Sequence, residues 1–172
     1  MPKRVYNNVV GSRIIDNGRV VEDVTQFSPP TIKHPVTSMQ NVSGMAADVD
    51  IPDTTHVEAM EVSFKHNNGV NCRYLMDPGK HDIEGRFARQ SYNTAGAEIE
   101  HESVKFRMIG MHVENSKSEL ENGSPYGSTD KFSLLRYEEE INGNVVLLID
   151  AMAGKITVNG RDYTSTIENL LK

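Results

Sequence analysis

Acidic residues recur at alternate positions in two stretches of the sequence. Glu98, Glu100 and Glu102 alternate in one stretch, and Glu138 and Glu140 do so in the other. Two nearby carboxyl groups are the groups that hydrolyse glycosidic bonds, one as the acid and the other as the base or nucleophile. Aromatic side chains that stack on sugars are scarce, since the chain has six tyrosines and no tryptophan. The alternation therefore favours a charged strand face over a hydrolytic site.

Other residue types that could perform chemistry lack suitable neighbours. The six histidines are scattered, without the spacings that would place two metal ligands on one helix or strand face, so we expect surface or ordinary hydrogen-bonded side chains. Ser128 and Lys131 match the SxxK pattern of β-lactamases, but so short a pattern recurs by chance. Cys72 has no nearby base in the sequence and is expected to be a small buried apolar side chain. We therefore expect no enzymatic activity, no cofactor and no metal.

The composition argues against several classes of protein. The 172 residues suffice for one domain with a core. The formal net charge is −6, whereas proteins that grip nucleic acid present an excess of Lys and Arg. A single cysteine cannot form an internal disulfide. The N-terminus lacks a signal-peptide core, and no run approaches the ~18 apolar residues of a membrane span, so we expect synthesis in the cytoplasm and no membrane insertion.

Alternation of apolar and polar residues predicts a mainly β chain. Strands are predicted at 19–27, 59–66, 83–92 and 98–114. Short helices are predicted at 69–76 and after Ser165, where Ser165 and Glu168 have the spacing of a capping box. Prolines predict an extended arm near 29–52, because proline cannot donate to a strand ladder. A polar stretch rich in Ser, Gly and Asn predicts a long exposed loop near 114–131. The apolar positions change face near Met108, which predicts a bulge.

The stretch 132–150 predicts a β-hairpin. Asn142 and Gly143 both tolerate the positive φ of a type I′ turn. A loop of two or four residues pairs residues whose numbers sum to about 285, whereas a three-residue loop with a bulge would shift this register by one and exchange the faces of the second strand. The second strand is apolar on both sides, so we expect both of its faces to be buried, one of them by another subunit. The predicted subunit interface comprises Tyr137, Val145, Leu147 and Ile149.

These elements together predict one domain spanning 1–172, of the mainly β (α+β) class. We expect an antiparallel β-sandwich or barrel with one or two short helices. An alternative is a β-barrel that binds a small apolar ligand. The chain shows no up-and-down repeat of eight strands, so this alternative is disfavoured.

Several segments resemble the major tail tube proteins of contractile-tailed bacteriophages and R-type tailocins, over nearly the whole chain. Two of these segments lie in the first third of the chain: 24–32 contains Val-Thr and a pair of prolines, and 44–52 contains Gly-Met and Val-Asp. The others lie near the C-terminal end and are Tyr137, 141–143, 149–150, 158–162 and 169–171. The glycine cluster that usually precedes Gly-Met is reduced here to Ser43 and Gly44.

The resemblance implies a structural subunit of a tail tube. In this family six subunits contribute strands to one ring-wide barrel, and the rings stack into a tube inside a contractile sheath. The implied partners are further copies of the chain, the tail sheath protein, the tape measure protein and the baseplate proteins that initiate the tube. The implied location is the virion, after assembly in the host bacterial cytoplasm. A tailocin tube or a type VI-like tube with protein cargo are alternatives with the same fold.

A tube that conducts DNA needs an inner wall that does not bind it. Acidic side chains repel phosphate, so we expect at least one of the sets Glu98, Glu100, Glu102 and Glu138, Glu140 to face the channel. Arg86 and Arg89 would partly offset this charge. The alternative is that both sets face the sheath.

Overall fold

The computed structural model describes residues 4–40, 44 and 46–172, and nearly all of its regular structure is antiparallel β. The strands are β1 (Arg4–Asp16), β2 (Arg19–Val20), β3 (Val24–Ser28), β4 (Val36–Met39), β5 (Val49–Pro52), β6 (Met60–His66), β7 (Lys80–Asn93), β8 (Glu98–Lys117), β9 (Ser128–Ile141), β10 (Asn144–Asp150), β11 (Lys155–Val158) and β12 (Arg161–Asp162). A short 3-10 helix, η1 (Arg73–Met76), and one α-helix, α1 (Ser165–Leu170), complete the fold. The mainly β prediction is confirmed.

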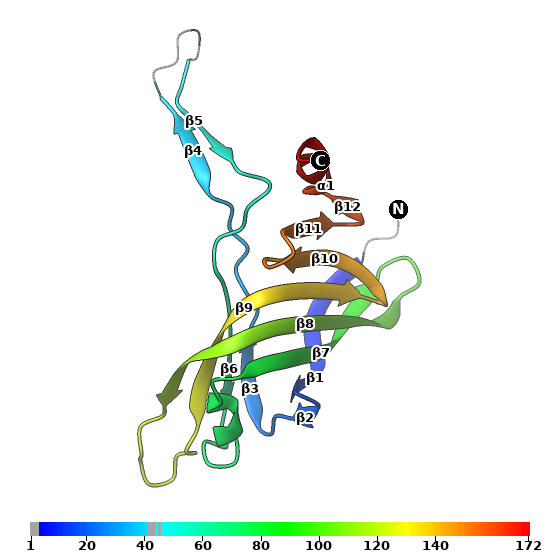
Figure 1. Cartoon of the computed structure of the whole chain (residues 1–172). Helices are drawn as coiled ribbons and strands as arrows, with labels where there is room; N and C mark the ends of the chain where they lie inside the picture. Colours follow the sequence, from blue (N-terminus) through cyan, green and yellow to red (C-terminus); the bar gives the residue numbers. More distant parts are fainter. Residues whose placement is uncertain (1–3, 41–43, 45) are drawn as a thin grey trace.

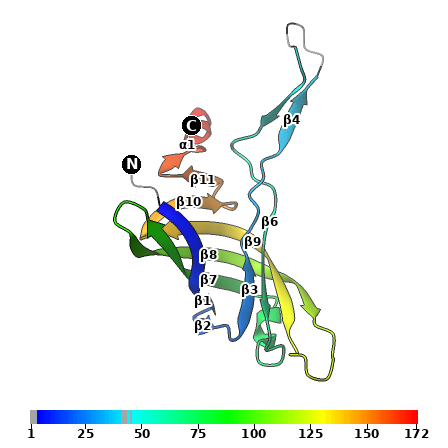
Figure 2. The ribbon, with the colours of Figure 1, turned by 180° about the vertical axis from the view of Figure 1, so that it is seen from behind.

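One ten-stranded sheet forms the body, in the order β12-β11-β10-β9-β8-β7-β1-β2, with β6 and β3 branching from β9 (Figure 1). The branch arises because β9 is long: residues 128–134 pair with β6, and residues 136–141 pair with β10. β3 and β6 cross one face of β7 and β8 (Figure 2), where the Phe27 ring lies 5.1 Å from Phe87 and 5.6 Å from Phe106 between centroids. The described chain places no second layer on the opposite side, which we call the open face (the side of β7, β8 and β9 away from the core).

The core lies between these two layers. Met60, Val62 and Phe64 alternate along β6 and are buried, as the period of two predicts. β7 and β8 pair in one unbroken register, so Phe106 and Met108 of β8 face the same side as this layer. The buried hydrophobic residues of the core are Ile14, Val21, Met60, Val62, Phe64, Cys72, Leu75, Ile83, Met108, Phe132, Leu134, Tyr137, Ile149 and Ile156.

The predicted β9–β10 hairpin is confirmed, and next to the turn it has the register of a two-residue loop. Asn142 and Gly143 form the turn with φ of 49° and 84°. Val145 lies opposite Glu140, so the residue numbers sum to 285 next to the turn. A bulge then shifts the pairing by one, and Ile149 lies opposite Tyr137.

The structure differs from the predictions at two element boundaries that matter for the fold and at one strand that the sequence did not predict. The strand predicted at 19–27 is divided, because Asp23 adopts a φ of 55° and turns the chain between β2 and β3. The loop predicted at 114–131 covers only 118–127, because β8 and β9 extend into it and bury polar side chains. No pattern above predicts β1, although Asn17 and Gly18, with φ of 47° and 81°, form the same kind of turn at its end.

Helix α1 begins where predicted but is capped differently. The Asp162 carboxylate accepts hydrogen bonds from the backbone N–H groups of Thr164 and Ser165, at 2.9 and 3.0 Å. These bonds hold the pKa of Asp162 below its ordinary value. The Glu168 side chain, which the predicted capping box requires, lies outside the described residues.

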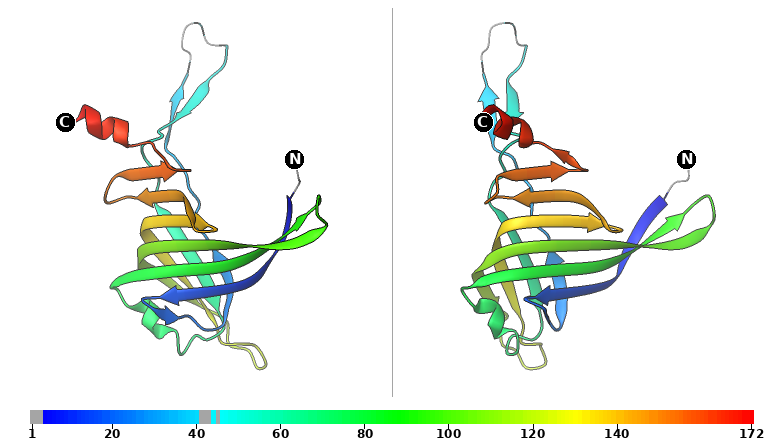
Figure 3. Two further views of the ribbon diagram at one scale, coloured as in Figure 1. Left: turned by 90° about the vertical axis from the view of Figure 1, so that its right-hand side faces the viewer. Right: turned by 45° about the vertical axis from the view of Figure 1, so that its right-hand side comes forward.

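The arm is a separate two-stranded hairpin, β4 and β5, that projects from the body (Figures 1 and 3). His34 Nδ1 lies 3.0 Å from the carbonyl oxygen of Asp53 and 2.7 Å from that of His56, so its N–H fastens the base of the arm. Residues 41–43 and 45 of the predicted arm lie outside the described residues.

Candidate assembly surfaces

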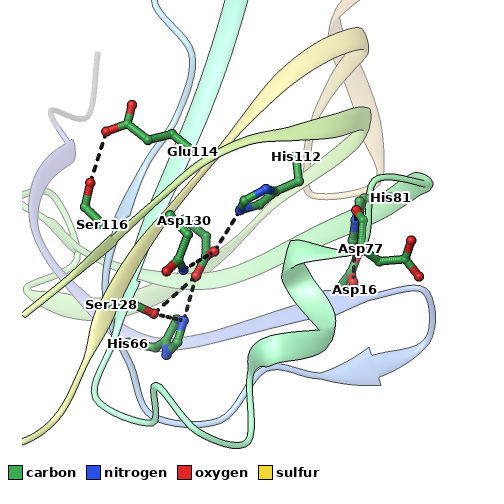
Figure 4. Close-up of polar contacts among 10 residues, drawn as sticks. Asp16, His66, Asp77, His81, His112, Glu114, Ser116, Ser128 and Asp130 are labelled. Atoms are coloured by element: carbon green, nitrogen blue, oxygen red, sulfur yellow. Dashed lines mark hydrogen bonds and ion pairs between the residues drawn. The ribbon is translucent and has the colours of Figure 1, made fainter.

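Ser128, His66 and Asp130 lie together but do not form a catalytic triad (Figure 4). His66 Nε2 contacts both Ser128 Oγ, at 3.1 Å, and Asp130 Oδ2, at 2.8 Å. A triad needs the acid and the nucleophile on different ring nitrogens, and His66 Nδ1 is buried without a partner. Lys131, the other SxxK residue, pairs with Glu114 at 2.9 Å instead. The cluster is buried, so no substrate reaches its serine.

Asp130 instead fastens the strands around it. Its Oδ1 lies 3.0 Å from His112 Nε2 and 2.6 Å from Asn115 Nδ2, both on β8, while its Oδ2 bonds to His66 on β6. Burial opposes ionisation of this carboxyl, but the hydrogen bonds outweigh it and hold the pKa of Asp130 below its ordinary value. Within 4–40, 44 and 46–172, no group of three or more His, Cys, Asp or Glu residues is arranged to hold a metal.

His81 and Asp16 form a second buried pair. His81 Nδ1 lies 3.0 Å from both carboxylate oxygens, and its Nε2 donates to the Asp77 carbonyl at 2.8 Å (Figure 4). Burial raises the pKa of Asp16 despite the opposing effect of His81. The pairs His66–Asp130 and His81–Asp16 are both buried and structural. His66 and His81 are therefore hydrogen-bonded core residues.

The two acidic sets lie on opposite faces of the sheet. Glu138 and Glu140 lie opposite Arg107 and Lys105 of β8, so they share the open face with these odd-numbered residues. Glu98, Glu100 and Glu102 are even-numbered residues of β8 and share the side of Phe106 and Met108, which face the core. The two sets therefore cannot line the same surface of one sheet.

The acids of the open face are matched by basic side chains. Arg107 bridges Glu138, at 2.8 Å, and Glu140, at 3.2 Å. Arg136 pairs with Glu138 at 3.0 Å. One strand further along, Glu84 accepts from Lys105 at 3.0 Å and Arg86 at 2.5 Å. The open face is thus a ladder of paired charges rather than an acidic wall.

The other acidic set is also partly paired. Glu100 lies 2.9 Å from Arg4. Glu102 pairs with Arg89, whose guanidinium also stacks over the Tyr6 ring at 4.0 Å. Glu98 is exposed near the tip of the β7–β8 ribbon.

Two of the four predicted interface residues lie in the core of the subunit itself. Tyr137 is 3% exposed and Ile149 is 2% exposed, so their burial needs no second subunit. Ile149 lines a cavity together with residues of β6 and the base of the arm, so the same chain lies against this side of β10. Leu147 packs against the core from a partly buried position, and Val145 is 43% exposed. Only Val145 retains a substantial surface for another chain.

β1 has an unpaired strand edge. Within the described chain, residues 4–13 of β1 pair with β7 on one side and with no strand on the other. Together with the β7–β8 hairpin this part of β1 extends past the core (Figure 3). Several of its side chains are exposed and apolar, namely Val5, Tyr6, Val9 and Val10. An unpaired, apolar edge of this length is a site for strand pairing with another chain.

Comparison with known families identifies the chain. A profile described as phage tail tube protein FII matches residues 12–171. The chain belongs to this family. The phage tail tube protein FII family is one of structural tube subunits, and the tube function expected from the sequence is confirmed.

Solved structures share the fold of this phage tail tube protein. The sheath/tube terminator of the extracellular contractile injection system PVC matches with a TM-score of 0.51 and 10% identity, over 78% of this chain and 96% of that one. A chain of the PVC sheath-tube complex in the extended state matches with a TM-score of 0.50 and 11% identity, over 75% and 87%. No curated protein sequence gives a significant match.

The described part of the tail tube protein contains no helix with the length and apolar character that a membrane crossing requires.

Proposed function

We propose that this protein builds the inner tube of a contractile phage tail, in which rings of six copies stack into a conduit for DNA. The open edge of β1 is the observation that supports ring formation. When it pairs with the far side of the next copy, the same contact repeats around the ring and no edge is left unpaired. The exposed Val145 lies on the hairpin at the opposite side of the sheet order and contributes to this contact.

The open face is the proposed wall of the channel. The other side of the main sheet is already covered by β3 and β6, so only the open face is available to line a ring-wide barrel. Glu138 and Glu140 are then lumen residues, while Glu98, Glu100 and Glu102 lie on the side of the ribbon that meets the neighbouring copy. Because Arg107 and Arg136 form ion pairs with Glu138, they are not available to bind phosphate.

We infer the remaining partners from the family to which the chain belongs. The β3–β6 layer faces outward, towards the tail sheath protein. The tape measure protein occupies the channel before DNA does, and baseplate proteins initiate the stack. The protein is assembled in the host bacterial cytoplasm and remains in the virion. A small-ligand barrel is disfavoured, because aromatic side chains such as Phe64 and Phe132, 5.3 Å apart, fill the space between the layers.

Negative-stain electron microscopy of the purified protein tests this function. We expect rings or tubes, whereas compact monomers at all concentrations would contradict it. Particles from producing cells test the cargo. Tails attached to DNA-filled capsids support a phage tube, and tails without capsids indicate a tailocin.

A further inference from the structure

Glycine follows asparagine at five places in the chain. The five asparagines are Asn17, Asn68, Asn122, Asn142 and Asn159. An asparagine before glycine can lose its side-chain amide without an enzyme, because glycine has no Cβ to keep its backbone nitrogen away from the asparagine side chain. The reaction needs a side chain that is free to turn and a backbone that is free to rotate beside it. The structure separates the five sites by these two requirements.

The carboxamides of Asn142 and Asn17 are held at both of their polar atoms. Asn142 Oδ1 accepts from the Ser103 N–H at 2.9 Å, and its Nδ2 donates to Glu102 at 3.1 Å. The carboxamide of Asn17 bonds in the same way to two backbone groups of β7, at 3.1 and 3.3 Å. Both side chains would have to break two hydrogen bonds before they could react.

Asn68 is held as well, and the nitrogen that would attack it is occupied. Its Oδ1 accepts from the Asn71 N–H at 3.2 Å, and its Nδ2 donates to Glu22 at 3.3 Å. The attacking nitrogen would be that of Gly69, whose N–H donates to the Tyr126 carbonyl at 3.0 Å.

Asn159 is exposed but lies in a tight hairpin turn between β11 and β12, with a φ of 48°. In a type I′ turn the nitrogen of the next residue points away from the asparagine side chain, so the reaction requires the turn to open. Backbone bonds hold the turn on both sides. The Asn159 N–H donates to the Val146 carbonyl at 2.8 Å, and the Tyr163 N–H donates to the Ile156 carbonyl at 2.9 Å.

Asn122 meets both requirements. It is exposed in the loop 118–127 between β8 and β9 (Figure 1), and its carboxamide has no hydrogen-bond partner among the described residues. Gly123 has a φ of 91°, and no heavy atom lies within 4 Å of the position that a Cβ would take there. One backbone bond closes the turn, from the Ser124 N–H to the Glu121 carbonyl at 3.1 Å. Rotation beside Asn122 therefore breaks one hydrogen bond rather than a strand ladder.

We propose that Asn122 is the site at which this chain deamidates spontaneously. The Gly123 backbone nitrogen attacks the side-chain carbonyl carbon of Asn122 and forms a new C–N bond. The bond to the amide nitrogen breaks, and ammonia leaves with the proton that the Gly123 nitrogen gives up. Water then opens the succinimide ring at either carbonyl and yields aspartate or isoaspartate.

The product carries a carboxylate next to Glu121 in the sequence and adds one negative charge to the formal net charge of −6. The reaction involves a single copy of the chain, so it does not rest on the proposed tube function.

Peptide mapping of the unassembled subunit after incubation at mildly alkaline pH tests this proposal. Cleavage after Lys and Arg releases residues 118–131, in which Asn122 is the only asparagine. The other four Asn-Gly pairs lie on the separate peptides 14–19, 66–73, 137–155 and 156–161. Asn122 should deamidate at least about tenfold faster than each of the other four, because their reaction must first break more hydrogen bonds.

Unfolding the subunit in urea is the control for the effect of structure. All five sites should then deamidate at similar rates, since no folded contact protects any of them. If one of the other four sites reacts as fast as Asn122 in the folded subunit, the proposal is wrong. The same spread of rates in the folded and unfolded chains equally overturns it.

The substitution Asn122→Gln gives a second readout by anion-exchange chromatography. The longer side chain would have to close a larger ring, and the position is exposed, so the variant should fold but no longer produce the more acidic form. The matched control is Asn159→Gln, at the other exposed asparagine without a side-chain hydrogen bond in the described chain, and it should still produce that form. An acidic form that persists in Asn122→Gln, or that is lost in Asn159→Gln, assigns the modification elsewhere and overturns the proposal.

Discussion

Asp130 is a buried carboxylate that joins two strands through hydrogen bonds. It is fully buried, and its two oxygens bond to side chains from β6 and β8. An isolated buried charge would be strongly destabilising, so these partners are what allows it there. His66 and His112 are therefore expected to be needed for the stability of the fold rather than for chemistry.

Asp130→Asn should change how stability depends on pH. The pKa of Asp130 is lower in the folded chain, so its ionised form stabilises the fold above the ordinary carboxyl pKa of about 3.9, and this contribution is lost as the pH falls through the lower folded-state pKa. The variant should lose about 1.5–3 kcal/mol of unfolding free energy at pH 7 and show a smaller loss on acidification. Urea denaturation of the disassembled subunit at pH 3 to 7 measures both.

Asp16→Asn is the matched control. The pKa of Asp16 is raised, so this carboxyl favours the fold below the ordinary pKa and loses that contribution as the pH rises through the folded-state value. Its removal should make stability fall more steeply on acidification. The same pH dependence in both variants would contradict these assignments.

Among the strands and turns, the features that depend on neighbouring residues could be predicted from the sequence. Asn142 and Gly143 specify the β9–β10 hairpin because few residues tolerate their φ values. The apolar period of β6 likewise predicts its buried face. What covers a strand is a long-range property, so the pattern shows that Ile149 needs burial but not that the same chain supplies it. The sequence predicts Ser128 and Asp130 to be loop residues, because their partner His66 is distant in the sequence and local patterns do not show the contact.

Val9→Lys tests the open edge of β1. Val9 is 61% exposed, so the substitution should leave the subunit folded. Charged side chains, lysine above all, are a device by which edge strands avoid pairing, and we expect the variant to remain monomeric. Sedimentation of the variant and the unmodified protein measures the difference.

Met111→Lys is the control for this edge. Met111 is 49% exposed but lies on β8 opposite Lys80 of β7 and Ser133 of β9, so it has strand partners on both sides. It should assemble normally. If Val9→Lys forms rings as readily as Met111→Lys, the edge of β1 is not the ring contact.

For the whole molecule, the register of β8 decides which side each acid occupies. The alternation that makes both acidic sets look alike in the sequence gives no relation between β8 and β9. That relation is the register of residues 104–109 of β8 with residues 136–141 of β9, which places Glu138 and Glu140 opposite Arg107 and Lys105. The ion pairs of Arg107 and Arg136 with these glutamates then show that this surface carries balanced charge. The expected acidic wall thus becomes a surface whose arginines are already occupied.

The double substitution Glu138→Gln and Glu140→Gln tests the channel wall. It should free Arg107 and Arg136 on the open face while preserving side-chain shape. Tubes assembled in the presence of fluorescent duplex DNA should then retain it, and less at higher salt, since each phosphate contact adds about −0.9 to the slope of log affinity against log salt. The control is Glu100→Gln with Glu102→Gln, which frees Arg4 and Arg89 on the opposite side. Retention by the control tubes but not by the Glu138 and Glu140 variant would show that the open face does not line the channel.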